Sequence, residues 1–391
     1  MGCPRGTVPR PQLAARRGHR QVRDACVPRH PGVPFPLHSP GRIRAPNRAR
    51  IHSSDDEGDA VSEQIKAIVA EAGADGKMVA GLKTLSLSDL PNEDVLVHVA
   101  YSTVNYKDGL AVTGKGKICR TLPMVPGIDI AGTVVESRDA NWHPGDRVVL
   151  NGSGLSEDQW GGYAQKQRVR GAFLVRCPDE FSFAEAMALG TAGYTAMLCV
   201  NAIRDHGVKP ADGPIVVSGA AGGVGSVAII LLARLGYEIA AVTGRPATGE
   251  WLKSLGATTI VPRDELARDA KPLEKERWAA GVDNVGANTL ATMLAQTKYE
   301  GIVAACGLAG GMGLPTSVMP FILRGVTLRG IDSVQAALPR RQRAWRDLAQ
   351  LIDRDALAKI YTTKPLAEVP ALANQILGGT IQGRVVIDVN A

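Results

Sequence analysis

Residues 215–226 read Ile-Val-Val-Ser-Gly-Ala-Ala-Gly-Gly-Val-Gly-Ser, and this stretch decides the fold. An apolar run typical of a buried strand leads into Gly222, Gly223 and Gly225, and residues 227–235 follow with a helical pattern. Glycines let a pyrophosphate approach the backbone, and free N–H groups at the helix N-terminus attract that anion. The first glycine of the GxGxxG pattern is replaced by Ala220. The strand–turn–helix order still favours a dinucleotide-binding turn over a tight turn without a ligand.

The end of the next predicted strand indicates which nucleotide this turn binds. NAD-specific sites carry an Asp or Glu about 20 residues after the turn, which holds the ribose 2′-hydroxyl. Thr243, Gly244 and Arg245 occupy that place here. A hydroxyl and a guanidinium bind a 2′-phosphate, whereas a carboxylate repels it. The sequence therefore favours NADPH, with a solvated loop charge as the alternative interpretation of Arg245.

Further apolar runs continue the pattern along the chain. Strand-like segments alternate with helical stretches at residues 215–218, 239–243, 258–261, 282–285 and 301–306. A spacing of roughly 20–30 residues between such segments is typical of a doubly wound parallel sheet. We therefore predict a Rossmann NADPH-binding domain over residues 191–334.

A second, β-rich unit surrounds this domain in the sequence. Short strands punctuated by Gly and Pro are predicted at residues 64–70, 95–102, 130–137 and 147–150, and a final strand at 383–389. A helix over 183–204, with Gly190 and Gly193 suggesting a close-packed crossing, leads into the Rossmann domain. The predicted fold is α/β, with a catalytic domain formed by residues 61–190 and 335–391.

Residues 1–60 differ in composition from the rest of the chain. The whole chain carries 45 Lys and Arg against 38 Asp and Glu, or +7, which first suggests a polyanionic partner. Residues 1–50 hold eleven Arg, no Lys and a single acid, so they carry +10 and leave −3 for the remainder. We interpret residues 1–60 as a disordered Arg- and Pro-rich extension. A mis-assigned start near Val61, an organellar transit peptide and a nucleic-acid-binding arm are the three explanations.

The composition argues against several other classes of protein. Residues 215–233 form a long uncharged stretch, but the glycines within it fit a strand, a turn and a helix better than a membrane span. His98, His143 and His206 are too scattered for a metal site, and no paired-cysteine ligand set appears. The separated cysteines indicate a reducing, cytoplasmic setting; they are residues 3, 26, 119, 177, 199 and 306. We predict no metal, no membrane and no nucleic-acid partner.

A polar cluster at Asn105, Tyr106, Lys107 and Asp108 is the densest one outside the nucleotide domain. A tyrosine flanked by an amide, an ammonium and a carboxylate can position a carbonyl group or relay a proton. A capped turn with a packed tyrosine is the structural alternative. We predict Tyr106 as the catalytic residue, supported by Asn105 and Asp108.

These motifs together resemble the medium-chain dehydrogenase/reductase superfamily over residues 64–390. The residues that carry the resemblance are 105–108, 126–134, 145–148, 190–196, the turn at 220–225 and 383–385. Zinc-dependent members carry a ligand Cys where Asn105 stands and Gly-His-Glu where Gly127, Ile128 and Asp129 stand, so the chain resembles the zinc-free reductases. The superfamily implies a GroES-like form for the catalytic domain.

Further segments are similar to the NADPH-dependent acryloyl-CoA reductase branch; they are residues 106–108 with 113–117, 304–311 and 319–324. The resemblance implies reduction of acryloyl-CoA to propanoyl-CoA, a homodimer and a cytoplasmic location. A quinone or enone reductase of the same fold is the alternative. NADPH would then contact Tyr106, Ala221, Gly222, Gly223, Val224, Thr243, Gly244, Arg245, Arg263, Leu308, Ile322, Ser333 and a residue near Gly379.

The phosphates of CoA need cations, and two groups of residues are candidates. Lys115, Lys117 and Arg120 follow the polar cluster, and residues 340–343 read Arg-Arg-Gln-Arg. A solvated helix start is the favoured interpretation of the second group.

Overall fold

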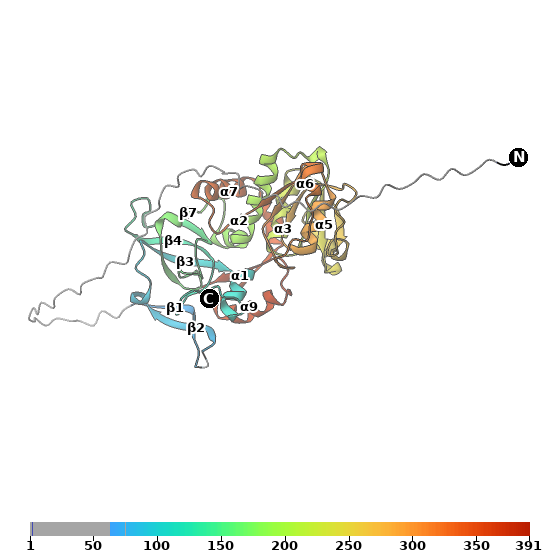
Figure 1. Ribbon diagram of the computed structural model, residues 1–391. Helices are drawn as coiled ribbons and strands as arrows, with labels where there is room; N and C mark the ends of the chain where they lie inside the picture. The colour runs from blue at the N-terminus through green and yellow to red at the C-terminus, as the bar shows by residue number, and fades with distance from the viewer. Residues whose placement is uncertain (1, 3–62, 75) are drawn as a thin grey trace, which may run out of the picture. The chain divides into compact units, whose positions relative to one another are not determined.

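Strand β8 (Ile215–Val217), the apolar run before the glycine turn, lies inside a six-stranded sheet. The computed structural model describes residue 2, residues 63–74 and residues 76–391 (Figure 1). Apart from residue 2, the interpretations offered for residues 1–60 therefore lie outside the described residues.

The six-stranded sheet has the order β10, β9, β8, β11, β12, β13, and every neighbouring pair is parallel. This is the doubly wound order of a Rossmann domain, in which ligands bind at the carboxyl ends of the strands where the order reverses. That point lies between β8 and β11. The remaining strands are β9 (Ile239–Thr243), β10 (Thr259–Pro262), β11 (Trp278–Asp283), β12 (Thr297–Ala305) and β13 (Thr327–Gly330).

Helices cover both faces of this sheet. The side chains of β8 are all apolar and point to its two faces in turn, so each face needs a cover. Ile215 and Val217 pack into one core with helices α2 (Phe183–His206) and α3 (Gly223–Arg234). Val216 faces the other way, into a core that contains residues of α5 (Ala287–Gln296). Both faces of the strand are therefore buried.

A mixed sheet forms the second, GroES-like part of the molecule. Its order is β14, β15, β3, β4, β5, β7, and β6 also pairs with β3. The last strand of the chain, β15, lies antiparallel to β3, so the C-terminus returns to the first unit as predicted. The bounds are β3 (Val95–Thr103), β4 (Asp129–Ser137), β5 (Arg147–Asn151), β6 (Lys166–Val169), β7 (Val175–Arg176), β14 (Tyr361–Pro365) and β15 (Arg384–Asp388).

The other elements border these two sheets. A separate hairpin joins β1 (Gln64–Ala72) to β2 (Met78–Ser86). The remaining helices are α1 (Tyr106–Thr113), α4 (Gly249–Ser254), α6 (Met319–Arg324), α7 (Leu338–Leu351), α8 (Arg354–Ala358) and α9 (Val369–Leu377).

Helix α2 connects the two parts and is itself interrupted. Gly190 has φ 47° and ψ −153°, so two helical segments meet there rather than one continuous helix. Among the described helices, α2 has the length and apolar character of a membrane span, and 89% of that stretch is buried inside the protein. Its side chains join a core that extends from β8 to Ala131 of β4 and Val149 of β5.

Two local predictions need correction. Helix α3 begins at Gly223 and not at residue 227, because its first turn is closed by backbone bonds such as Ser226 N to Gly222 O at 3.0 Å. The strand predicted at 282–285 is β11, which begins at Trp278 and ends at Asp283. Small residues in Trp278-Ala-Ala-Gly281 hid this strand, although all four are buried.

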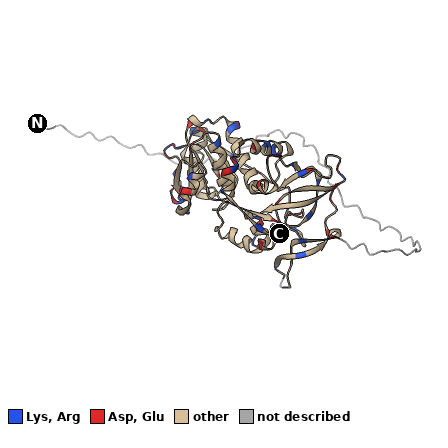
Figure 2. Ribbon diagram, turned by 180° about the vertical axis from the view of Figure 1, so that it is seen from behind, with Lys and Arg blue, Asp and Glu red and all other residues tan. Residues whose placement is uncertain are grey.

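Basic and acidic residues are interspersed over the described body, as Figure 2 shows. Many of them pair with each other, for example Arg268 with Glu274 at 2.6 Å and Arg354 with Glu185 at 2.6 Å. A mixed surface of this kind agrees with the small net charge of the chain after residue 50.

Candidate functional site

The polar cluster at residues 105–108 forms the start of helix α1. Asn105 precedes the helix, and Asp108 accepts hydrogen bonds from the Asn105 backbone N–H at 2.9 Å and from its amide Nδ2 at 3.0 Å. This reciprocal arrangement closes the first helical turn. Asp108 is fully buried, whereas Tyr106 is 49% exposed. The capped turn is therefore present, but the tyrosine beside it is exposed and not packed, and its catalytic role stays a prediction.

The Asn105 amide joins two buried carboxylates. Its Nδ2 also donates to Asp129 Oδ2 at 2.7 Å. The other Asp129 oxygen accepts from Asn151 Nδ2 at 2.6 Å and from the backbone N–H and hydroxyl of Thr191 at 2.9 and 2.7 Å. Asp129 thus ties the start of α1 to β5 and to the second segment of α2.

These contacts change the acidity of Asp108. Burial removes the carboxyl from water, and the nearby Asp129 carboxylate adds repulsion, so the pKa of Asp108 rises to about 7. Hydrogen bonds from Asn105 and from the Ile128 N–H act in the opposite direction and are weaker. Near neutral pH this site therefore exchanges a proton.

Arg384 on β15 supplies the positive charge of the network. Its guanidinium donates to the Asn105 side-chain oxygen at 3.1 Å, to Thr103 Oγ1 at 2.7 Å and to the Ala188 carbonyl at 3.0 Å. Burial lowers the pKa of Arg384, and the charges of Asp129 and Asp108 oppose that change. The side chain also lies against the glycine turn, because a Cβ on Gly223 would stand 3.0 Å from Arg384 Cδ.

The glycine turn has the shape that a pyrophosphate requires. Gly222 precedes α3, and Gly223 is its first residue, followed by Val224. A Cβ on Gly225 would lie 2.5 Å from the Gly219 carbonyl, so only glycine allows the helix to pack this closely on the strand end. The Ala221 carbonyl accepts from the Gly383 N–H at 3.1 Å, which holds the turn beside Arg384. A cradle of backbone at a helix N-terminus fits a dinucleotide phosphate.

The residues predicted at the end of β9 do come together. Thr243 Oγ1 accepts from the Arg245 N–H at 3.0 Å. The Arg263 guanidinium packs against Gly244, since a Cβ added to Gly244 would lie 3.0 Å from Arg263 Cζ. Arg245 reaches back to the turn and to the C-terminal segment, donating to Ala221 O at 3.3 Å, Ile381 O at 3.3 Å and Gly379 O at 3.4 Å. Two guanidiniums and a hydroxyl stand here, and no carboxylate occupies the position after β9.

The loop that carries Leu308 packs against Asn284, the residue that follows β11, at the same edge of the sheet. A Cβ on Gly307 would lie 2.3 Å from the Asn284 carbonyl, and Asn284 Nδ2 donates to Ser218 O at 2.6 Å at the end of β8. Leu308 is 59% exposed, and Ile322 on α6 is 70% exposed. The Ser333 carbonyl accepts from Arg341 at 3.2 Å. Contact of Leu308, Ile322 and Ser333 with a cofactor stays a prediction.

The candidate cations for CoA divide into free and engaged groups. Arg120 pairs with Glu157 at 2.8 Å, and Lys107 pairs with the same carboxylate. Arg341 corrects the interpretation of residues 340–343 as a solvated helix start, because it is only 5% exposed and its guanidinium donates to carbonyls such as that of Ala336 at 2.8 Å. Lys115 and Lys117 follow α1 and remain candidates.

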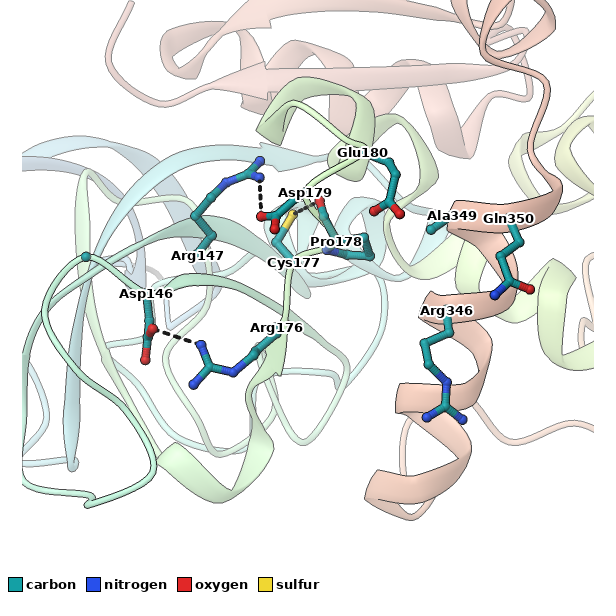
Figure 3. A pocket seen from close by; sticks show the side chains of 11 residues that line it. Asp146, Arg147, Arg176, Cys177, Pro178, Asp179, Glu180, Arg346, Ala349 and Gln350 are labelled. Carbon is teal, nitrogen blue, oxygen red and sulfur yellow. Dashed lines mark hydrogen bonds and ion pairs between the residues drawn. The ribbon is translucent and has the colours of Figure 1, made fainter.

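A pocket of about 560 Å³ lies elsewhere, between the β5–β7 region and α7 (Figure 3). None of the predicted site residues lines it. Its arginines are largely neutralised, with Arg147 paired to Asp179 at 3.2 Å and Arg176 to Asp146 at 2.8 Å. Its Cys177 thiol has a pKa raised to about 11 by burial, so the thiol is a poor nucleophile. This pocket shows no feature of the predicted chemistry.

The sequence reasoning missed Asp129, Arg384, Thr191 and Asn151 as members of the site. Charged residues inside the apolar strands β4 and β15 were a usable signal, because buried charges are rare unless paired. By the resemblance stated above, Asn105 stands in place of the ligand Cys of zinc-dependent members, and Ile128 and Asp129 stand in place of their His-Glu pair. Asn105 donates to Asp129. Within the described residues no group of three or more His, Cys, Asp or Glu is placed to hold a metal ion.

Comparison with known proteins agrees with this architecture. Residues 91–179 match the model of the alcohol dehydrogenase GroES-like domain, and residues 223–354 match that of the zinc-binding dehydrogenases. The acrylyl-CoA reductase AcuI of Ruegeria pomeroyi is 55% identical over 317 residues, which cover 81% of this chain and 96% of that protein. The putative quinone oxidoreductase YhfP of Bacillus subtilis is 41% identical, over 84% of this chain and 99% of its own length.

A solved structure shows the same likeness. The structure of Escherichia coli YhdH with bound NADPH has a TM-score of 0.81 and 52% identity, and the match covers 83% of this chain and all of that one. Identity above 50% over nearly the full length of such relatives establishes the family. The chain belongs to the medium-chain dehydrogenase/reductase superfamily, in its acryloyl-CoA reductase branch.

Proposed function

We propose that this chain reduces acryloyl-CoA to propanoyl-CoA with NADPH. The 55% identity to the Ruegeria acrylyl-CoA reductase over 96% of its length carries this proposal. The site agrees with it, because Arg384 contacts both the glycine turn and the start of the helix that bears Tyr106. We assign the cofactor-binding residues predicted above to NADPH. We assign residues 191–334 to the NADPH-binding domain and residues 61–190 and 335–391 to the catalytic domain.

Bound NADPH would supply a hydride to Cβ of the conjugated thioester, and a proton must then reach Cα, so that the C=C bond becomes a single bond. The thioester oxygen gains negative charge during this addition and needs a hydrogen-bond donor. Tyr106 is the first residue of α1, is 49% exposed, and is the residue we assign to this task.

Asn105 and Asp108 act through Tyr106 and do not touch the substrate. Both N–H bonds of the Asn105 amide go to Asp108 and Asp129, and its oxygen accepts from Arg384. Asp108 is buried behind them. They are therefore positioning residues, which fix the angle at which α1 presents the tyrosine.

A homodimer in a cytoplasmic setting completes the proposal. Among the described strands β13 pairs only with β12, so its outer edge is open for another strand. The neighbouring segment exposes apolar side chains at Leu308, Met312, Leu314, Val318, Ile322 and Leu323. The four cysteines described are free thiols, as expected in a reducing compartment.

The substrate is tested by following NADPH consumption with acryloyl-CoA and with a simple quinone at equal concentration. We expect turnover of acryloyl-CoA to be much faster. The likeness to the putative quinone oxidoreductase YhfP favours the second candidate, a quinone or enone reductase. Quinone turnover that exceeds acryloyl-CoA turnover by orders of magnitude would establish that candidate instead.

A further inference from the structure

Two loops from different parts of the molecule meet beside the parallel sheet. The first, which we call the β5 loop, is residues 152–155 and follows β5 in the GroES-like part. The second, the β13 loop, is residues 331–337 and joins β13 to α7. Because β13 runs parallel to β12, the β13 loop lies at the carboxyl edge of the sheet, where ligands of this fold bind.

The two loops contact each other directly through their backbones. The Ser153 N–H donates to the Val334 carbonyl at 3.1 Å. A Cβ on Gly152 would lie 3.0 Å from Val334 Cα and 3.3 Å from the Ser333 carbonyl. Gly152 also has φ 62°, a conformation that favours glycine. The spacing between the loops is therefore short and sensitive to any added atom.

The Arg341 side chain, in the first turn of α7, joins both loops. Its guanidinium donates to the Asn151 carbonyl, at the end of β5. It also donates to the Ser333 carbonyl at 3.2 Å and to the Val334 carbonyl in the β13 loop. Its Nε donates to the Ala336 carbonyl at 2.8 Å. A single planar group thus holds carbonyls that come from both sides of the contact.

Arg341 occupies a position where a cation is costly. It is 5% exposed, and within the described residues its guanidinium pairs with no carboxylate. Burial lowers its pKa. It also lies in the first turn of α7, where the helix dipole disfavours positive charge. A well-packed apolar side chain avoids these costs, so the particular contribution of the arginine is the contact that it makes between the loops.

The joined loops connect the edge of the parallel sheet to helix α1. On one side, the Ile331 N–H donates to the carbonyl of Ala305, the last residue of β12, at 2.9 Å. On the other side, Asn151 Nδ2 donates to Asp129 Oδ1 at 2.6 Å. The second Asp129 oxygen accepts from Asn105 Nδ2 at 2.7 Å, where α1 begins. An unbroken series of hydrogen bonds therefore runs from the sheet edge through the guanidinium to α1.

We propose that Arg341 is a positioning residue for hydride transfer, which holds the β13 loop and the β5 loop at one fixed spacing. That spacing sets the distance between a nicotinamide at the sheet edge and an electrophile beside α1. Arg341 itself touches neither group, because its side chain is buried. The inference rests on the proposed function, in that it requires a hydride acceptor beside α1.

Arg341→Lys is the variant that tests this role. Lysine keeps the positive charge, but its compact ammonium group cannot span the carbonyls of both loops. Single-turnover stopped-flow kinetics, with the NADPH complex mixed with acryloyl-CoA, measures the hydride step apart from product release. We expect its rate constant to fall by roughly ten- to a hundredfold, since a misplacement of about 1 Å slows a reaction to that extent.

The dissociation constant for NADPH, measured by fluorescence titration, should change far less than this rate constant, because Arg341 does not contact the cofactor. Arg346→Lys, at an exposed arginine on the same helix, is the matched control. It should leave the rate constant and the NADPH affinity unchanged.

Hydrogen exchange of backbone amides gives a second readout, which does not depend on turnover. The Ser153 N–H is bonded to the Val334 carbonyl across the two loops. It should exchange faster in Arg341→Lys and at its normal rate in Arg346→Lys. Gly152→Ala disturbs the same spacing from the β5 loop and keeps the arginine, so it should also slow the single-turnover step.

A merely structural role of Arg341 has a different signature. Loss of folded enzyme lowers the amplitude of the single turnover and leaves the rate constant of the remaining enzyme unchanged, and this result overturns the proposal. A normal rate constant together with faster exchange at Ser153 also overturns it, because the spacing then does not govern the reaction. If Arg341→Lys does not fold, an unchanged rate constant in Gly152→Ala overturns the proposal.

The choice of hydride acceptor is tested separately by the same experiment. If a quinone oxidises NADPH and acryloyl-CoA does not, the proposed function fails. The single-turnover comparison with the quinone then tests Arg341 in the same way, and a slowed step with either acceptor supports the positioning role.

Discussion

At the scale of single residues, the Asn105 side chain uses its whole hydrogen-bonding capacity inside the protein. Its amide donates to Asp108 and Asp129, and its oxygen accepts from Arg384. Its neighbour Tyr106 is 49% exposed. The residue that we propose to meet the substrate is therefore separate from the residues that hold it.

Replacing Tyr106 by Phe tests this division of roles. The ring is retained, so we expect NADPH to bind as before, while kcat falls by roughly 10²-fold because the proton or hydrogen-bond donor is lost. Steady-state kinetics with acryloyl-CoA and a fluorescence titration of NADPH measure the two effects. Tyr299→Phe, at another exposed tyrosine, should leave both values unchanged. An unchanged kcat in the Tyr106 variant would remove this residue from proton transfer.

The raised pKa of Asp108 makes the stability of the fold depend on pH. The unfolded carboxyl loses its proton near pH 4, whereas the folded one keeps it up to about pH 7. The folded state binds more protons in this window, so the free energy of unfolding should fall as pH rises from about 4 to about 7 and level off above it. The size of the loss is on the order of a few kcal/mol.

Urea denaturation at a series of pH values measures this dependence. Asp108→Asn cannot titrate, so the stability difference between the unmodified protein and this variant should shrink across the window. Asp158→Asn, at an exposed carboxylate, is the matched control. If the difference for Asp108→Asn grows with pH instead, the assigned direction of the pKa is wrong.

We propose that Arg245 sets the preference between the two nicotinamide cofactors. It follows the end of β9, where the sequence predicts the 2′-phosphate site, and its guanidinium donates to the Ala221 and Ile381 carbonyls. We expect Arg245→Gln to raise the KM for NADPH by roughly ten- to a hundredfold, because a charge-assisted bond is lost. The KM for NADH, which has no 2′-phosphate, should change little and is the internal control. An equal rise for both cofactors would show that Arg245 shapes the turn only.

At the scale of elements, the interruption of α2 places the second helical segment beside Asp129. A Cβ on Gly190 would lie 2.8 Å from Thr103 Cγ2 and 3.0 Å from both Asp129 Oδ2 and Arg384 Nη2. Its backbone also has a positive φ that side chains disfavour. Thr191, the next residue, binds Asp129 through its backbone N–H and hydroxyl. The glycine is required by the network rather than by the helix.

We expect Gly190→Ala to destabilise the protein by roughly 3 kcal/mol or more, from backbone strain and overpacking combined. Gly207→Ala at the end of the same helix is the matched control, since Gly207 has φ 98° and open space around it. That variant should lose about 1 kcal/mol, the cost of the backbone conformation alone. Urea denaturation of both variants gives the comparison, and equal losses would show that the crowding at Gly190 has no effect.

The elements differ in how far the sequence predicts them. Continuous apolar runs locate β8 and β9, because both faces of a doubly wound sheet are buried. The glycine turn is equally local and was assigned from its own residues. Asp129 and Arg384 lie 255 residues apart, and nothing in either segment indicates that the other is its partner. Arg341 shows the same limit, because its burial depends on carbonyls supplied by other loops.

At the scale of the whole molecule, the net charge of +7 describes residues 1–50 and not the folded body. The match to the Ruegeria relative takes in 96% of that protein and 81% of this chain, so about a fifth of this chain lies outside the match. We therefore expect deletion of residues 1–60 to leave kcat and the KM for acryloyl-CoA unchanged. The same deletion should abolish any salt-dependent binding to DNA, since the excess of arginine is removed with it.

Steady-state kinetics and a DNA-binding titration at two salt concentrations test both effects, with the full-length and the shortened protein compared side by side. A loss of turnover in the shortened chain would mean that these residues serve the enzyme, and DNA binding that survives the deletion would place a polyanion site on the body itself.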